Sequence, residues 1–253
     1  MKLAKQATTP PKGLDKKKIV KKTKKIIKKI EVLQHQMCAQ GKHSLLIVLQ
    51  GMDASGKDGV VKNAFSSISP NEINTVSFKK PSKEEFAHDF LWRVHKHAPA
   101  KGMVTVFNRS HYEDILVPKV YGYLDEKVVS ERFELINNFE KQLQHGGTKV
   151  IKFFLNVSKD EQYDRLKERI DLQEKHWKHN DGDWETRKHR EEFEAVYEEI
   201  FEKCNQPKWH IVPADTNWYK TYFVAKTVLK TLEGMDIEWT DLETEMVEIP
   251  SKR

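Results

Sequence analysis

Five short apolar runs divide the chain, and segments with helical periodicity separate them. Strands are predicted at 44–50, 73–78, 103–108, 149–157 and 208–214. Helices are predicted between and after them, at 57–67, 83–96, 125–144, 159–169, 185–203 and 218–233. Strands that alternate with helices are typical of a parallel sheet covered on both faces. The pattern therefore predicts an α/β fold with a five-stranded parallel sheet flanked by helices.

The segment before the first strand, residues 15–40, is dense in lysine and still carries one apolar stripe. The stripe recurs at three- and four-residue steps, which predicts an amphipathic helix, and consists of Ile19, Thr23, Ile26, Ile30, Leu33 and Met37. Its lysines form either a solvated face or a contact with a polyanion. The stripe could pack on the same domain or on another subunit, so a homo-oligomer is expected.

The two ends of the chain show less pattern. Residues 1–14 contain "TTPPKG" and no periodicity, which predicts a flexible tail. Residues 15–253 are expected to form a single domain. Within it the stretch 235–253 is acidic, ends near a proline, and carries no assignment.

Composition limits the class of protein. Charged residues make up 32% and apolar residues 38%, and no run of about 18 apolar residues could span a bilayer. The N-terminus lacks the apolar segment of a secretory signal, so a cytoplasmic protein with no membrane partner is expected. The two cysteines, Cys38 and Cys204, match no metal or redox spacing and are expected to be reduced. A net charge of +6 predicts an acidic partner: nucleic acid, anionic lipid, nucleotide or inorganic polyanion.

The stretch "SLLIVLQGMDASGKDG" contains the clearest chemical signal. Gly51, Gly56 and Lys57 satisfy G-x-x-x-x-G-K, with an apolar strand before and a helix after, which is the context of a phosphate-binding loop. Backbone N–H groups and the helix N-terminus then face the phosphates, and the lysine neutralises them. The next residue is Asp58, where Ser or Thr usually binds Mg²⁺.

A second carboxylate, Asp53, lies inside the same loop. A lone carboxylate that faces bound phosphates needs a metal ion or a proton to share. Asp53 is therefore a candidate metal ligand or acceptor-activating carboxylate. The alternative is that Asp53 caps the helix that follows the loop.

Polar side chains gather again after the third strand, in "FNRSHYEDIL". They fall at the carboxyl edge of the sheet, where open α/β folds bind ligands. Arg109 can bind phosphate oxygens in a bidentate manner, and Glu113 or Asp114 can hold magnesium. The alternative is a charged surface turn.

Residues 165–199 combine many cations with the polar break "HNDGD". This composition indicates a hinged lid that closes over a phosphate chain, although a solvated helical pair would carry the same charges. The cations are Arg165, Lys167, Arg169, Lys175, Lys178, Arg187, Lys188 and Arg190. A base could rest near 77–81 and the helix after it, where Phe78 either stacks on the base or packs in the core. Candidate nucleotide contacts are Phe78, Lys79, Arg93, Asn108 and Arg109.

These segments together resemble the polyphosphate kinase 2 family. The resemblance rests on "GMDASGKDG", "FNRSHYEDIL", "INNFEKQL" (136–143), "EKHWK" (174–178) and "WHIVPADTNWYK" (209–220), and covers about residues 15–230. It implies a P-loop kinase fold like that of thymidylate kinases, with a helical lid, Mg²⁺ as cofactor, and polyphosphate in a basic channel under the lid.

The resemblance also implies roles for single residues. By motif match the phosphate-binding loop includes Gly51, Ala54, Gly56, Lys57, Asp58 and Gly59. Asp53 and Lys57 would face the reacting phosphates, and Arg109, Glu113 and Asp114 would bind phosphate and metal. The lid cations that would contact the phosphate chain are Lys167, Arg169, Lys175 and Lys178.

The implied reaction is in-line transfer of the terminal phosphoryl group of polyphosphate to a nucleotide. Asn108 in "FNRS", where members restricted to diphosphates resemble "FDRS", favours both AMP and ADP as acceptors, with ATP as a product. Lys220 occupies a position where arginine is common in relatives. Lysine there replaces a planar guanidinium group by an ammonium group, which is a point charge.

Two other functions fit part of the sequence. An ATP-dependent nucleoside monophosphate kinase would share the loop but predicts Ser or Thr at position 58. A nucleic-acid-binding protein predicts aromatic residues among the cations, for which Trp177 and Trp184 give slight support. The loop and second motif together favour catalysis and no nucleic-acid partner.

Overall fold

The computed structural model describes residues 2–242 and contains one five-stranded parallel sheet. The strands are β1 (Ser44–Gln50), β2 (Ile73–Val76), β3 (Val104–Asn108), β4 (Thr148–Asn156) and β5 (Trp209–Pro213). Their order across the sheet is β2-β3-β1-β4-β5. The predicted fold class, a P-loop kinase fold with a five-stranded parallel sheet, is confirmed. The stretch 235–253 has no assignment from the sequence, and residues 243–253 of it lie outside the described residues.

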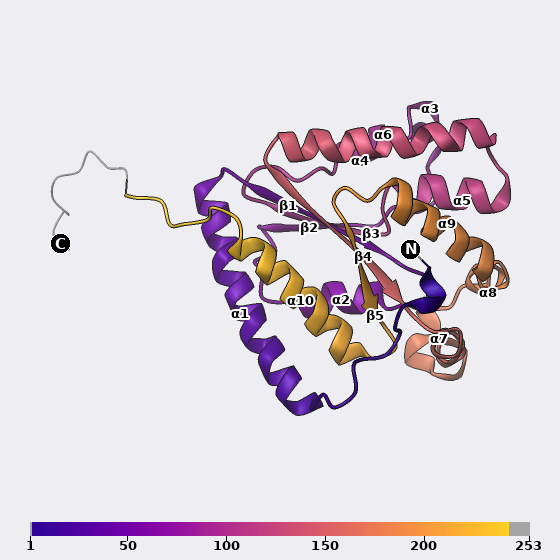
Figure 1. The fold of residues 1–253 in the computed structure, drawn as a ribbon, viewed down its shortest axis with the longest axis horizontal. Helices are drawn as coiled ribbons and strands as arrows, with labels where there is room; N and C mark the ends of the chain where they lie inside the picture. Colours follow the sequence, from indigo (N-terminus) through magenta and orange to yellow (C-terminus); the bar gives the residue numbers. More distant parts are fainter. Residues whose placement is uncertain (1, 243–253) are drawn as a thin grey trace.

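Helices cover both faces of the sheet (Figure 1). One face carries α1 (Lys16–Gln40), α2 (Lys57–Ala64) and α10 (Asn217–Glu233); the other carries α5 (Glu113–Tyr121), α6 (Glu126–His145) and α9 (Arg190–Lys203). All seven residues of β1 are buried, because the strand is central and covered on both sides. The apolar stripe of α1, including Ile26 and Ile30, is buried mainly against α10 of the same chain.

Three helical predictions differ from the structure. The single helix expected at 185–203 is divided at His189 into α8 (Asp181–Lys188) and α9. The single helix expected at 83–96 is instead two short helices, α3 (Lys83–Ala87) and α4 (Trp92–His95), and α3 begins with a capping box between Ser82 and Glu85. Helix α5 was not predicted, because Pro118 lies inside it. Proline has no N–H for the carbonyl of Asp114 four residues earlier, and Arg132 Nη1 donates to that oxygen at 2.5 Å instead.

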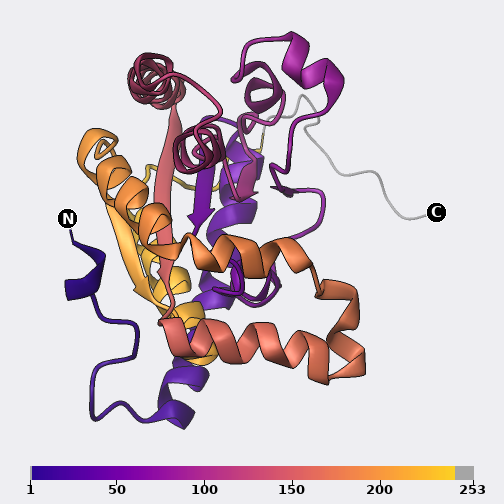
Figure 2. The same cartoon turned by 90° about the vertical axis from the view of Figure 1, so that its right-hand side faces the viewer.

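A helical arm extends from the carboxyl edge of the sheet (Figure 2). It consists of α7 (Lys159–Asp171), the 3₁₀ helix η2 (Gln173–Lys178), α8 (Asp181–Lys188) and the start of α9. The predicted break at "HNDGD" lies between η2 and α8, where Asn180 Oδ1 accepts from the N–H of Gly182 at 3.0 Å. The arm occupies the region at about 165–199 where a lid is predicted, and it is called the lid below.

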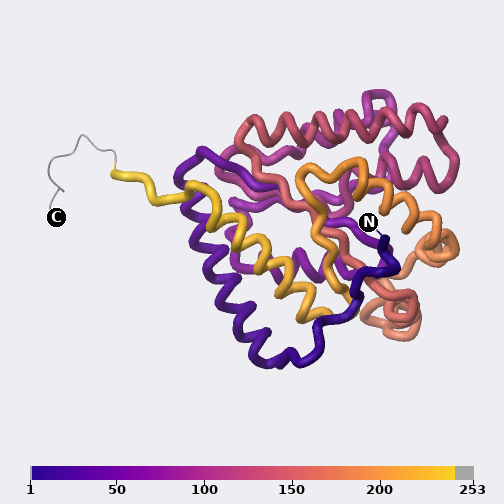
Figure 3. Tube along the Cα trace, viewed as in Figure 1, coloured from indigo at the N-terminus to yellow at the C-terminus, as the bar shows by residue number. Residues whose placement is uncertain are grey.

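The N-terminal segment runs along the β5 side of the sheet to α9 (Figure 3). It contains a short 3₁₀ helix, η1 (Leu3–Lys5), and the Leu3 side chain is buried. Its backbone is bound at two places: the carbonyl of Thr8 accepts from the N–H of Asp215 at 2.9 Å, and Asn156 Nδ2 donates to the carbonyl of Gln6 at 3.2 Å. These contacts contrast with the flexible tail expected at 1–14.

Along residues 2–242, none of the helices has the length and apolar character that crossing a bilayer requires.

Candidate active site

A polar cavity of about 730 Å³ opens at the carboxyl edge of the sheet, between the β1–α2 loop and the lid. This is the edge at which parallel α/β sheets bind ligands. The pairing of Leu49 in β1 with Asn108 in β3 brings the ends of the two strands level, so the motifs that follow them meet. Predicted site residues that line the cavity are Asp53, Ala54, Gly56, Lys57, Asp58, Gly59, Lys79, Asn108, Arg109, Arg169, Lys175 and Lys178.

The loop after β1 has backbone conformations that favour glycine. Gly51 has φ +149°, and a Cβ atom there would lie 2.8 Å from the carbonyl oxygen of Leu155. Gly56 has φ +93° and precedes the first residue of α2. Lys57 is buried and donates from Nζ to the carbonyls of Gly51 (2.7 Å) and Met52 (3.2 Å). Burial lowers the pKa of Lys57 to about 8.

Two cations from other elements fix this loop. Arg165 of α7 donates to the carbonyls of Ala54 and Ser55, each at 3.0 Å, so this predicted lid cation supports the loop backbone. Lys220 of α10 donates to the carbonyl of Ser55 at 2.9 Å and lines the cavity. Burial, with the charge of Arg165, lowers the pKa of Lys220 to about 7. The sequence marked Lys220 only as a departure from relatives, because its contact with the loop spans 165 residues.

Asp53 forms an ion pair with Arg109 across the cavity. Arg109 has φ +64°, a left-handed conformation that a residue with a side chain adopts only where its surroundings hold it. The residue that precedes α2 is Gly56, and no side chain caps that helix, so Asp53 does not have the capping role considered as an alternative.

Asp58 and Asn108, the two unusual residues of the motifs, are partners. Asn108 Nδ2 donates to Asp58 Oδ1 at 2.7 Å. A carboxylate at position 108 would instead put two negative charges together. The amide therefore lets an aspartate follow the loop lysine.

The two acidic residues of the second motif have different partners, and neither Glu113 nor Asp114 lines the cavity. Glu113 accepts from Gln50 Nε2 at 3.0 Å, and burial raises its pKa while Arg109 lowers it. Asp114 is paired with buried Arg93 at 2.9 Å, and neither lines the cavity. Burial raises the pKa of Asp114, and its bond to Arg93 opposes that change.

Phe78 is also remote from the cavity surface. Its side chain is 4% exposed and packs edge-to-face on Phe107, with ring centroids 4.9 Å apart. This is the core position that the sequence left open, and it leaves no ring face for a base. Residues 77–80 still contribute to the cavity, through Ser77, Lys79 and Lys80.

Most predicted lid cations are paired with carboxylates. Arg169 contacts buried Asp183 at 2.5 Å, and Lys175 contacts Glu168 at 2.5 Å. Lys167 pairs with Asp171 and does not line the cavity. Lys178 lies 4.9 Å from the ring centroid of Trp177, a cavity residue that is 78% exposed. An anion that enters under the lid would compete with these carboxylates for the cations.

Glu140, which belongs to the "INNFEKQL" motif, contacts the turn between β3 and α5 from the buried side. Tyr112 donates to Glu140 Oε1 at 2.8 Å, and His111 Nε2 lies 3.2 Å from the same oxygen. Fully buried Lys152 donates to Glu140 Oε2 at 2.7 Å. Because His111 and Tyr112 lie between Arg109 and Glu113, this anchor fixes the turn that presents both.

The donor set fits a divalent cation that is shared with phosphates. Among residues 2–242, no three His, Cys, Asp or Glu side chains gather closely enough to hold a metal by themselves. Mg²⁺ commonly takes one or two protein carboxylates and completes its shell with phosphates and waters. Asp53 could supply one such carboxylate, and it is close enough to the buried Glu113 to help raise the pKa of that carboxyl group.

Comparison with known proteins agrees with this geometry. The family model "Polyphosphate kinase 2 (PPK2)" matches residues 13–240. The chain is 41% identical over 219 residues to the AMP/ADP-polyphosphate phosphotransferase of Meiothermus ruber, covering 86% of this chain and 82% of that protein. It is 34% identical over 229 residues to the ADP-polyphosphate phosphotransferase of Rhodopseudomonas palustris, covering 85% and 79%.

Solved structures show the same relationship. The crystal structure of polyphosphate kinase 2 from Arthrobacter aurescens TC1 superimposes with a TM-score of 0.92 at 35% identity, covering 97% of this chain and 90% of that one. The resemblance predicted from the motifs is thus confirmed. The chain belongs to the polyphosphate kinase 2 family.

Proposed function

We propose that this enzyme transfers the terminal phosphoryl group of inorganic polyphosphate to AMP and to ADP, producing ADP and ATP. The observation that carries the proposal is the cavity in which Lys57 and Asp53 of the phosphate-binding loop meet Arg109 beneath the cations of the lid. Support for the acceptors comes from relatives whose names specify AMP/ADP or ADP with polyphosphate.

The residues suit phosphoryl transfer, which depends on positioning and charge neutralisation more than on covalent chemistry. Lys57 and Arg109 neutralise oxygens of the transferred group, and backbone N–H groups at the start of α2 bind the adjacent phosphates. The lid, with Arg169, Lys175 and Lys178, closes over the polyphosphate and excludes water. Ser77 and Lys79 form the wall against which the acceptor nucleotide would lie.

We further propose Mg²⁺ as the cofactor, held by Asp53, with the buried Glu113 adding negative charge from behind the cavity wall. When bound, it would neutralise charge on the phosphates during transfer. Asp114 is left out of this ligand set because it is paired with buried Arg93 and neither side chain lines the cavity, whereas both Asp53 and its partner Arg109 line it. The reaction is reversible in principle, since both sides contain phosphoanhydrides.

The first experiment incubates the enzyme with Mg²⁺ and long-chain polyphosphate, with AMP or ADP as the acceptor, and resolves the nucleotides by chromatography. ADP and ATP should form from AMP, and ATP from ADP. Lys57→Ala and Asp53→Asn should each lower kcat by about 100-fold or more, the usual effect of removing one charge-stabilising group. Lys62→Ala, an exposed lysine on the same helix and outside the cavity, is the matched control.

Three results would contradict the proposal. Turnover only with ATP as donor would favour an ordinary nucleoside monophosphate kinase. ATP formed from ADP but no product from AMP would remove AMP as an acceptor. Full activity after removal of divalent cations with EDTA would exclude the proposed cofactor.

A further inference from the structure

Helix α1 carries two rows of lysines on the outside of the molecule. The rows have the same spacing, i, i+4, i+7 and i+11, which places each row along one line of a helix. The outer row is Lys17, Lys21, Lys24 and Lys28; the inner row is Lys18, Lys22, Lys25 and Lys29. All eight lysines are exposed.

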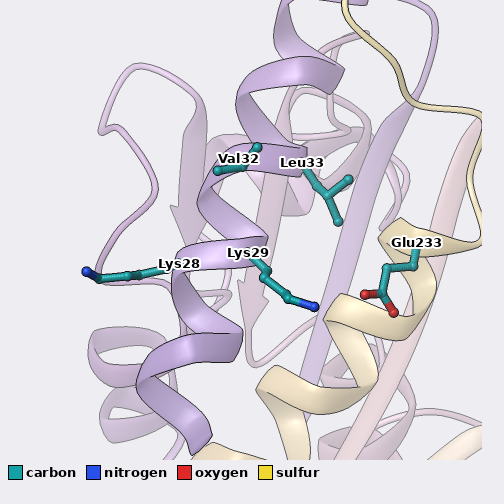
Figure 4. Close-up of a pocket in the computed structure, with 5 residues that line it drawn as sticks. All are labelled: Lys28, Lys29, Val32, Leu33 and Glu233. Carbon is teal, nitrogen blue, oxygen red and sulfur yellow. The ribbon is translucent and has the colours of Figure 1, made fainter.

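The inner row lies beside α10. Lys22 Nζ is 5.8 Å from the ring centroid of Tyr222 on α10, and Lys226 Nζ is 5.9 Å from the same centroid. Figure 4 shows Lys29 pointing across a surface pocket toward α10, where Glu233 lies, while Lys28, which also lines the pocket, points away from α10. The inner row therefore borders the groove between α1 and α10, and a cation of α10 joins it there.

These charges are costly for the isolated chain. The eight lysines make like-charge i, i+4 contacts, for example between Lys18 and Lys22, which destabilise a helix. Within residues 2–242, none of the eight forms an ion pair with a carboxylate, whereas lysines on other elements do. A polyanion seated on the row would remove this repulsion.

The inner row also lies on the side of the fold that contains the cavity. Helix α1 leads into β1 through residues 41–43 and lies antiparallel to it, so its lysine-rich N-terminal half is at the carboxyl edge of the sheet (Figure 1). The same edge contains the cavity, which Asn217 and Lys220 of α10 help to line. The inner row spans about 17 Å at 1.5 Å per residue.

We infer that the inner lysine row of α1, with Lys226, is a second binding surface for the distal part of a long polyphosphate chain whose end lies in the cavity. The inference rests on the proposed function. A chain held at two places binds more tightly than at either alone, because the second contact is intramolecular. A chain too short to reach from the cavity to α1 gains nothing from the row.

The test compares Lys18→Gln/Lys22→Gln/Lys25→Gln/Lys29→Gln with the matched outer-row variant Lys17→Gln/Lys21→Gln/Lys24→Gln/Lys28→Gln. Both remove four charges from the same helix. With long-chain polyphosphate and saturating ADP, the inner-row variant should raise the KM for polyphosphate about 10-fold at unchanged kcat, and the outer-row variant by no more than about 2-fold. With a short-chain preparation both variants should match the unmodified enzyme.

Equal effects of the two variants would overturn the inference, because they would indicate general charge attraction without a specific surface. An effect of the same size with short chains would also overturn it. If single-stranded RNA bound the inner row and long-chain polyphosphate did not, the partner would be a nucleic acid. Absence of polyphosphate-driven turnover in the unmodified enzyme would instead refute the proposed function, and polyphosphate binding measured directly would then still test the row.

Discussion

Asn108 donates a hydrogen bond to Asp58 across the mouth of the loop, at 2.7 Å. One residue follows the loop lysine and the other ends β3, so the contact joins the two motifs that define the site. It also explains why an aspartate is compatible with the position where a hydroxyl is usual.

Replacing Asn108 by Asp should place two carboxylates in contact and lower activity. We expect kcat/KM for polyphosphate to fall roughly 10-fold, because a like charge beside the site opposes phosphate binding. The double variant Asn108→Asp/Asp58→Asn reverses the pair and should recover most of the activity. Steady-state kinetics with AMP and with ADP would measure kcat/KM for both variants. If the double variant did not recover activity, contact between the two carboxylates would not be the cause of the loss in Asn108→Asp.

The buried pair Lys152 and Glu140 should dominate the stability of the second motif. Lys152→Met leaves the Glu140 carboxylate without its cation and should reduce the free energy of unfolding by about 3–5 kcal/mol. Lys152→Met/Glu140→Gln should be less destabilised than the single variant, since no buried charge remains. Urea unfolding measures this, with exposed Lys149→Met on the same strand as the control, expected to change by less than about 0.5 kcal/mol. A single variant as stable as its control would contradict the prediction.

Gly56 should not tolerate a side chain. Its φ of +93° disfavours any other residue, and a Cβ atom would lie 2.0 Å from Lys220 Nζ, so Gly56→Ala must displace that ammonium from the loop. We expect a loss of about 1–2 kcal/mol of stability together with a KM for polyphosphate raised several-fold. Gly234→Ala, at negative φ with its nearest atom 3.5 Å away, is the control. Normal kinetics in Gly56→Ala would mean that polyphosphate binding does not depend on the position of the Lys220 ammonium at the loop.

Phosphate binding should take up protons near pH 8. In the structure the pKa values of Lys57 and Lys220 are about 8 and about 7, so both groups are partly neutral at that pH. A bound phosphate stabilises the charged forms and raises both pKa values. Affinity should therefore be greatest below about pH 6, where both are protonated, and should fall as the pH rises from about 6 to 9.

Calorimetric titration with polyphosphate in two buffers of different ionisation enthalpy measures this uptake. Lys220→Arg, which remains charged, should reduce this uptake, while Lys230→Arg, at an exposed position of α10, should not. Heats independent of the buffer would refute the coupling.

Local patterns were sufficient to predict the sheet and the loop. The strand at 44–50 matches β1 residue for residue, because a buried run of branched side chains followed by Gly51 admits few alternatives. Helix α5 was missed because its proline is compensated by Arg132, which comes from another helix.

The site was harder to predict where partners come from distant parts of the chain. Asp114 looks like a metal ligand in sequence, yet Arg93 neutralises it, and that partner is 21 residues away. Arg165 resembles a lid cation in sequence, yet its guanidinium group donates to backbone carbonyls of the loop and of the β5–α10 turn. Residue type and spacing give the charge available at an edge of the sheet, whereas three-dimensional packing decides which charges are already used.

The ion pair between Asp53 and Arg109 has a consequence for a phosphate that binds together with a metal ion. A bare phosphate could satisfy Arg109 only by leaving Asp53 without its counter-charge, and a bare cation would have the opposite effect. A cation that arrives with its phosphates gives each of the two side chains a new partner at once. With the proposed Mg²⁺, this ion pair would favour binding of the metal–phosphate complex over either component alone.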